Sequence, residues 1–492
     1  MERRICTGHG DSNYKHVDVD IGNSDSNEFY MDNCGNVVYI TRKAFSGYKE
    51  YLHKVEGGHV RSIKYHGKEQ KEFLNIRNDH YRKVAIYYLS YDDGNVLPLL
   101  IGLGKSGTRN YKCYKRGDIF AQYSQWEALE GDVSTNIQEI AKEIRNAVVL
   151  NLSITTGIQY YVNGDPERPP LNNDIKIKVD HRIEQNYNVY RHMLQTLDAR
   201  IISTKHKNRT IAFMNAKYNL SLKSASVYYW SEDKDHENPL ILELSYGSST
   251  VYFRFSLNNL KWNHDGRILD IDTFNNDIDM QNCIHNKAHR VDISSLEKYI
   301  CSSCNSQTIE IVGEEIRMYY TKCRKVKHYI SSGKMSIASF HNNGIFQRGI
   351  PSTKNVDHVV VYKYPENGRP ILLAIASVDG KRWYKIHMNN LDEWETESGL
   401  GGNPSSLEIL TKLGEITGNN SASRGGNIAE KYPHARKRHS PEVNTINSDF
   451  VLLLIVSTFL LASLAFETYN YLFCPKNSFF RRLYRYVSLC RT

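Results

Sequence analysis

One composite pattern occurs three times in this chain and constrains its fold more than any other feature of the sequence. It consists of an aromatic and β-branched run, a polar turn, a proline that opens an aliphatic run, and a tryptophan further along. The copies contain Tyr87, Pro98 and Trp126; Tyr228, Pro239 and Trp262; and Tyr362, Pro370 and Trp394. The three prolines are 141 and 131 residues apart. Such repetition predicts that the chain builds the same supersecondary unit three times.

Each copy has the composition of β-structure. Two β-rich runs flank a turn of charged, Asn and Gly residues, which predicts a hairpin. A proline at the first position of a strand interrupts no central ladder bond, so it fits the start of the second run. The tryptophan is large and amphipathic, and we interpret it as a plug between sheets rather than a ligand platform. We therefore predict that the nine residues named above anchor three cores.

A helix is predicted at the end of each copy. Ile137, Ile140 and Ile144 share one helical face in the first copy, and Leu407, Leu410 and Leu413 do so in the third. Residues 270–283 show a weaker pattern of this kind. Related short strands are predicted to open the copies, at 17–20, 178–180 and 290–293. The predicted fold is mainly β, with α+β modules: three tandem β-sandwich-like repeats, each ending in a helix, plus one C-terminal transmembrane helix.

The predicted boundaries follow from these patterns. The repeats occupy 17–148, 178–284 and 290–417, and a linker with an extra strand occupies 149–177. A polar stalk follows at 418–449, then a transmembrane helix at 450–466 with an extension to 473, and a basic, aromatic tail at 474–492.

The run 450–466 has the composition of a membrane span. Only Ser457, Thr458 and Ser463 are polar in it, and as a helix it would be about 26 Å long, just under the thickness of the hydrocarbon core. A buried core helix is the alternative, but the run lacks an amphipathic stripe. We expect membrane lipid to contact Phe450, Leu454, Phe459, Leu461 and Phe466.

The orientation in the membrane stays open. Basic residues follow the run at Lys476, Arg481, Arg482, Arg485 and Arg491, and precede it at Arg436, Lys437 and Arg438. The positive-inside rule favours a cytoplasmic tail, with the bulk of the chain outside. The first ten residues contain no apolar run of the signal-peptide type, however, which favours a tail-anchored protein that faces the cytosol.

Cys301 and Cys304 form the only Cys-x-x-Cys motif, and Cys283, His285, His289, Cys323 and His328 lie nearby in the sequence. A structural zinc site usually needs a second, similarly spaced pair, and only Cys323 follows. Zinc, a local disulfide and plain thiols are three open interpretations, of which plain thiols are favoured. We predict no metal and no cofactor; Cys301, Cys304 and Cys323 come nearest to a ligand pattern.

The sequence contains no recognisable catalytic motif. Residues 102–107 resemble the end of a phosphate-binding loop, but Leu99 stands where that loop needs a glycine. The 63 basic and 54 acidic residues give a net charge of only +9 and are interspersed, so nucleic acid is not expected as a partner. We expect a non-catalytic protein, with a membrane-anchored hydrolase as the less favoured alternative.

The repeats resemble those of a large, lineage-expanded family of apicomplexan, piroplasm-type (Theileria and Babesia) membrane proteins, and more loosely FAINT repeats. Residues 226–230 and 239–243 match the pattern best, and the resemblance covers about 15–417. Leu89 and Tyr364 stand where the pattern has tryptophan. The resemblance implies exposure to the host, a protein or host-surface ligand as partner, and no established biochemical activity.

Overall fold

The computed structural model describes residues 15–418, except for 24–27, 46, 74–75, 109, 121–124, 156, 171–172, 195–198, 215–220, 248, 267, 269–270 and 319–320. Beyond Gly418, the predicted stalk, membrane run and tail lie outside the described residues, and with them Phe450, Leu454, Phe459, Leu461 and Phe466. Among the helices that are described, none is both long and apolar enough to cross a membrane.

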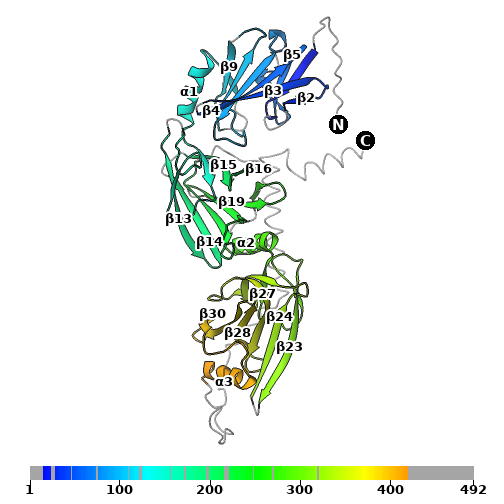
Figure 1. Ribbon diagram of the computed structural model, residues 1–492, viewed down its shortest axis with the longest axis vertical. Coiled ribbons are helices and arrows are strands. Elements are labelled where there is room, and N and C mark those ends of the chain that lie inside the picture. The colour runs from blue at the N-terminus through cyan, green and yellow to red at the C-terminus, as the bar shows by residue number, and fades with distance from the viewer. Residues whose placement is uncertain are drawn as a thin grey trace, which may run out of the picture. The chain divides into compact units, whose positions relative to one another are not determined.

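The described chain is mainly β-structure, as predicted, and its strands form several sheets (Figure 1). Three sets of strands follow one another, and each set is followed by an α-helix. We call residues 15–143 the first segment, 147–286 the second segment and 288–416 the third segment.

The described residues of the first segment form ten strands. They are β1 (Lys15–Asp20), β2 (Phe29–Met31), β3 (Val37–Ala44), β4 (Tyr48–Val55), β5 (Gly58–Tyr65), β6 (Lys68–Glu69), β7 (Lys83–Leu89), β8 (Leu100–Gly104), β9 (Tyr111–Arg116) and β10 (Trp126–Leu129). One sheet has the order β10-β9-β8-β7-β4-β3-β2, and the other has the order β1-β5-β6. Short 3-10 turns occupy Lys71–Phe73 and Ile76–Asp79, and α1 (Val133–Glu143) closes the segment.

The second segment also contains ten strands. They are β11 (Ala147–Asn151), β12 (Gln159–Tyr161), β13 (Lys176–Glu184), β14 (Tyr187–Leu194), β15 (Arg200–His206), β16 (Arg209–Met214), β17 (Ser224–Trp230), β18 (Ile241–Tyr246), β19 (Ser249–Ser256) and β20 (Lys261–Asp265). Their order is β11-β15-β16-β20-β19-β18-β17-β14-β13-β12. The helix α2 (Ile271–Asn286) follows.

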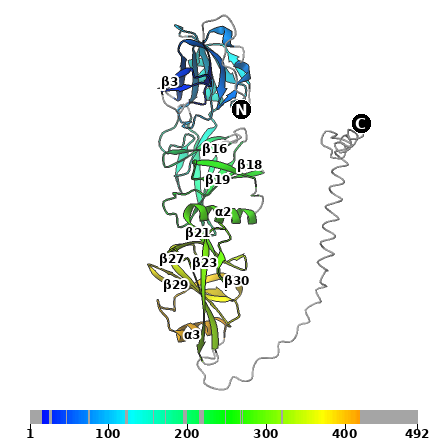
Figure 2. The same cartoon turned by 90° about the vertical axis from the view of Figure 1, so that its right-hand side faces the viewer.

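The third segment has ten strands as well. They are β21 (Ala288–Asp292), β22 (Tyr299–Ile300), β23 (Thr308–Met318), β24 (Thr321–Tyr329), β25 (Met335–Asn342), β26 (Ile345–Phe346), β27 (Thr353–Lys363), β28 (Pro370–Ser377), β29 (Gly380–His387) and β30 (Asn390–Glu397). The main path is β22-β23-β24-β27-β28-β29-β30, and β25 pairs with β21, β26 and β27. The helix α3 (Ser406–Ile416) lies at the end of this segment (Figure 2).

The opening strand of each segment is paired in the same way. β1, β11 and β21 run parallel to β5, β15 and β25, and the register of each pair shifts at one position. The shift follows Val17, Val148 and His289, so these three residues are structurally equivalent. Each strand ends three residues later, at Asp20, Asn151 and Asp292, whose side chain accepts the backbone N–H two residues further on.

This pairing differs from the prediction for the second copy. The predicted opening strand at 178–180 is part of β13, which pairs antiparallel with β12 and β14. The parallel opening strand is β11, so the predicted boundary at 148/149 falls inside a strand, and the predicted linker 149–177 holds the end of β11 and all of β12. The first and third opening strands end in Val-Asp, whereas β11 ends in Leu150-Asn151. The sequence therefore did not show that β11 is the equivalent opening strand.

Each helix covers the sheet face that carries the predicted tyrosine anchor. Ile137 and Ile140 of α1 pack in one core with Tyr87, and Phe274 and Ile278 of α2 pack in one core with Tyr228. In α3, the side chains of Ile409, Leu410 and Leu413 join the core that contains Tyr362. The capping residues Asp132 and Ser405 accept backbone N–H groups at the starts of α1 and α3.

Candidate functional site

All nine predicted anchors are buried, and the tryptophans are also hydrogen-bonded. The indole N–H of Trp126 donates to Gln70 Oε1 (3.2 Å). The indole N–H of Trp262 donates to Thr204 Oγ1 (2.8 Å), and that of Trp394 donates to Gln347 Oε1 (2.8 Å). A tryptophan that is buried and satisfied in this way serves packing, because neither its ring face nor its N–H group is available to a ligand.

A second repeated contact, which the sequence analysis missed, pairs a tyrosine with a buried histidine. Tyr30 Oη lies 3.4 Å from His53 Nδ1, and Tyr160 Oη lies 2.8 Å from His192 Nδ1. In the third segment the rings of Tyr299 and His328 meet edge to face at 6.1 Å. Each tyrosine oxygen also accepts the backbone N–H of the last residue of the opening strand: Asp20, Asn151 and Asp292.

These histidines are neutral interior groups. His53, His192 and His328 are all 0% exposed. Burial lowers the pKa of His53 and of His192 to about 3, and that of His328 to about 4. In each segment the histidine contacts the tyrosine whose hydroxyl is bonded to the opening strand. The histidines are enclosed too deeply to act on a substrate.

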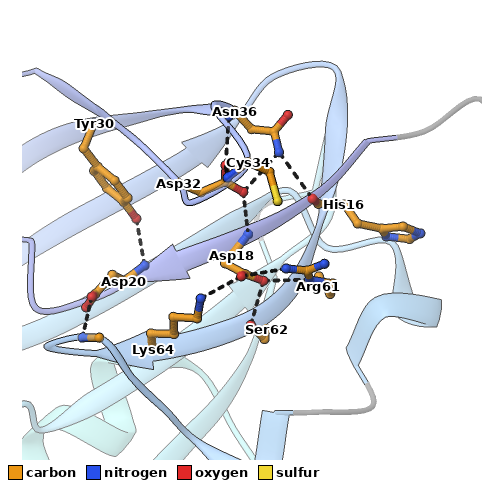
Figure 3. A network of polar contacts seen from close by, with 11 residues as sticks. His16, Asp18, Asp20, Tyr30, Asp32, Cys34, Asn36, Arg61, Ser62 and Lys64 are labelled. Carbon is orange, nitrogen blue, oxygen red and sulfur yellow. Dashed lines mark hydrogen bonds and ion pairs between the residues drawn. The ribbon is translucent and has the colours of Figure 1, made fainter. Parts of the chain in front are cut away.

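The first segment contains a charged network around Asp18 (Figure 3). The carboxylate is 6% exposed and accepts hydrogen bonds from Arg61 Nη2 (2.7 Å), Lys64 Nζ (2.7 Å) and Ser62 Oγ (2.8 Å). Burial alone would raise the pKa of Asp18, but the bonds from Arg61, Lys64 and Ser62 outweigh it and hold the pKa well below its usual range. The carboxylate is therefore ionised, and its side-chain partners Arg61, Ser62 and Lys64 all belong to β5. It is a structural group and not a general acid or base.

Four potential metal ligands from a helix, a strand and a turn meet at the start of the third segment. They are Cys283 in the last turn of α2, His289 in β21, and Cys301 and Cys304 in the turn after β22. Their ligand atoms all lie within 4.8 Å of one another. His289 Nδ1 is 3.0 Å from Cys283 Sγ and 3.8 Å from Cys304 Sγ, and the backbone N–H of Arg290 donates to Cys301 Sγ at 3.4 Å.

The structure brings together only two of the three cysteines that the sequence analysis named. Cys301 and Cys304 belong to the cluster, whereas Cys323 is a buried thiol of β24 that faces the core of the third segment. Burial raises the pKa of Cys323 to about 12, so it stays protonated. Cys283 and His289 were named near the motif but not selected as ligands, because one lies on a helix and the other on a strand, at no recognisable motif spacing from Cys301.

The groups of the cluster change one another's readiness to ionise. The interaction between the Cys283 and Cys301 thiols lowers the pKa of Cys301 and raises that of Cys283. For Cys304, burial opposes ionisation, but the hydrogen bonds from Cys283, Ser306 and the backbone N–H of Gln307 together outweigh it and lower the pKa. Cysteine binds metals as the thiolate, so a thiol that ionises readily is suited to be a ligand.

A shallow depression of about 290 Å³ lies between β29, β30 and α3. Its carboxylates are paired with lysines: Lys385 Nζ lies 3.2 Å from Glu397 Oε2, and Lys412 Nζ lies 3.5 Å from Glu397 Oε1. Burial would raise the pKa of Glu397, but the N–H of Gly399 and the charge of Lys385 outweigh it and lower the pKa. A glycosidase-type site needs one carboxyl group whose pKa is raised, and the pKa of Glu397 is shifted in the opposite direction.

Comparison with protein families finds no family that matches this chain, and no curated protein matches it either.

Proposed function

We propose that this chain is a non-catalytic, single-pass membrane protein that displays three tandem β-sandwich-like modules, each ending in a helix, as binding surfaces. The first, second and third segments correspond to the three modules. The partners are membrane lipid at the C-terminal span and a protein or host-surface ligand at the modules. No cofactor and no nucleic acid takes part.

The observation that carries the proposal is the position of α1 and α2 at the joints between successive modules. The core around α1 contains Val149 and Ile202 of the next segment, and the core around α2 contains Ala288 and Ala338 of the next. Each of these two helices therefore packs against its own sheet and against the next opening strand pair at once. Because apolar burial supplies most of the cohesion between such units, the modules support one another as neighbouring repeats do.

The charged and polar groups of the modules support a non-catalytic role. The rings of His53, His192 and His328, the N–H groups of the three anchor tryptophans and the Asp18 carboxylate all contact partners within their own segments. A membrane-anchored hydrolase would need a group left available for proton transfer in a cavity. In the depression beside α3, Lys385 and Lys412 instead form ion pairs with Glu397.

Membrane attachment is proposed from the composition of residues 450–466, and host exposure from the resemblance to piroplasm repeat proteins. If the bulk of the chain faces the cytosol, the same modules form a tail-anchored scaffold. The two versions share the modules and the span and differ in topology.

Carbonate extraction of membranes tests the attachment. The full chain should remain in the membrane pellet, whereas a variant with Leu454→Arg and Leu461→Arg should move to the supernatant, since each arginine at the centre of a span costs about 2.5–3.5 kcal/mol. A matched control places two arginines in the predicted stalk, at Ser423 and Asn427, and should stay in the pellet. A full chain that is extracted by carbonate would contradict the proposal.

A further inference from the structure

The Cys283, His289, Cys301 and Cys304 cluster has the composition of a closed structural metal site. Three thiols and one imidazole form one of the usual ligand sets of structural zinc. For Zn–S and Zn–N bonds of about 2.3 and 2.0–2.1 Å, the edges of a tetrahedron are roughly 3.5–3.8 Å long. The separations of 3.0 and 3.8 Å from His289 Nδ1 to two sulfurs, and the 4.8 Å limit for the whole set, enclose a space of that size.

The other two segments show that the fold does not require these residues. His289 occupies the position of Val17 and Val148, immediately before the register shift of the opening strand, and all three side chains are buried. Valine fills this position twice without a polar partner. A histidine at the same place costs desolvation unless it gains an interaction that valine does not need.

The turn after β2 and the turn after β22 carry different acceptors at the same place, Asp32 and Cys301. In the first segment the backbone N–H of Asp18 donates to Asp32 Oδ2 at 3.2 Å, and in the third the equivalent N–H of Arg290 donates to Cys301 Sγ at 3.4 Å. Thus a sulfur replaces a carboxylate as the acceptor. Hydrogen bonds of this kind to a ligand atom orient it and stabilise its anionic form in metal sites.

We propose that Cys283, His289, Cys301 and Cys304 bind one Zn²⁺ ion tetrahedrally. Three of the four ligand residues are buried and the fourth is half-buried, so all four positions belong to the protein and the ion is structural. The cysteines bind as thiolates, and their protons pass to solvent. Soft sulfur ligands exclude Mg²⁺ and Ca²⁺ from this site.

The ion has a structural consequence at the joint between the second and third segments. Cys283 belongs to α2, which closes the second segment, whereas the other three ligands belong to the third. Zinc therefore cross-links the two segments beside the ion pair of Arg290 with Asp279, which also joins β21 to α2. This consequence goes beyond the proposed display function and holds for either membrane topology.

The test measures metal in the full chain, purified in detergent under reducing conditions. We expect about one zinc per chain by mass spectrometry of metals, and tetrahedral thiolate bands in the visible and near-ultraviolet spectrum after exchange with Co²⁺. His289→Val, the residue found at this position in both other segments, should lower the zinc content at least tenfold while the chain still folds. Cys323→Ser changes a buried cysteine outside the cluster and should leave the zinc content unchanged.

A chelator provides the second readout. Removal of zinc should lower the Tm of the wild-type chain, because a ligand that binds only the folded state stabilises it, and should not change the Tm of His289→Val. The proposal is overturned if the wild-type chain contains no zinc, if His289→Val and Cys301→Ser retain it, or if native-source protein contains a Cys301–Cys304 disulfide.

Discussion

At the scale of residues, three buried histidines recur in equivalent places and contact a tyrosine that holds the opening strand. Their spacing explains why the sequence did not reveal them. Tyr30 and His53 are 23 residues apart, whereas Tyr160 and His192 are 32 apart, because the loops between the strands differ in length. The tryptophan and proline anchors were predictable, since each lies within a local pattern that three copies repeat.

These histidines predict that the protein loses stability in mild acid. Their pKa is about 3 to 4 in the folded chain and about 6.5 in the unfolded chain. Between these values only the unfolded chain binds the protons, so the free energy of unfolding should be constant above pH 6.5 and fall below it. The expected loss is about 1 kcal/mol per histidine between pH 6 and pH 5.

Urea unfolding at a series of pH values checks this expectation. His192→Phe should reduce the slope below pH 6.5, whereas His181→Gln, which changes an exposed histidine of β13, should leave it unchanged. An unfolding free energy that does not vary between pH 7 and pH 5 would show that the buried rings can take up protons.

At the scale of elements, α2 illustrates how a helix serves two segments. Its Asp279 accepts hydrogen bonds from the hydroxyl of Tyr187 in the second segment and from Arg290 and Ser339 in the third. The sequence predicted a weak helix here, because its apolar residues are few. Polar residues of α2 such as Asp279 also contact the next segment, which a pattern of apolar positions cannot reveal.

Asp279→Asn should therefore destabilise the joint strongly. The side chains of Asp279 and Arg290 are 7% and 14% exposed, and a buried pair that loses one charge leaves the other uncompensated, at a cost of about 3–5 kcal/mol. Glu184→Gln breaks the exposed pair with Arg182 in β13 and should cost less than about 1 kcal/mol. Equal losses in the two variants, measured by urea unfolding, would contradict the role of Asp279 at the joint.

The opening strand of the second segment shows where element prediction fails for a physical reason. β11 is short and parallel, and its partner β15 lies about fifty residues further along the chain, so no local hairpin pattern marks it. The predicted strand at 178–180 does exist as part of β13, but it has a different place in the sheet. The type of structure was thus accessible from composition and alternation, whereas the pairing partner was not.

At the scale of the whole molecule, two helices join three β-rich segments, and a C-terminal membrane span is proposed to follow them. The metal cluster shows the same limit of sequence analysis as the strand pairing. Its Cys-x-x-Cys half was visible, but Cys283 and His289 meet it only because α2 and β21 fold back onto the turn after β22. Long-range contacts of this kind depend on the fold of the neighbouring segment.

Protease accessibility in intact cells tests the central proposal most directly. The full chain carries a different tag at each end, and protease is added from outside before and after the membrane is permeabilised. A displayed protein should lose its N-terminal tag in intact cells and keep its C-terminal tag until permeabilisation. An N-terminal tag that stays protected in intact cells would contradict display on the outer surface.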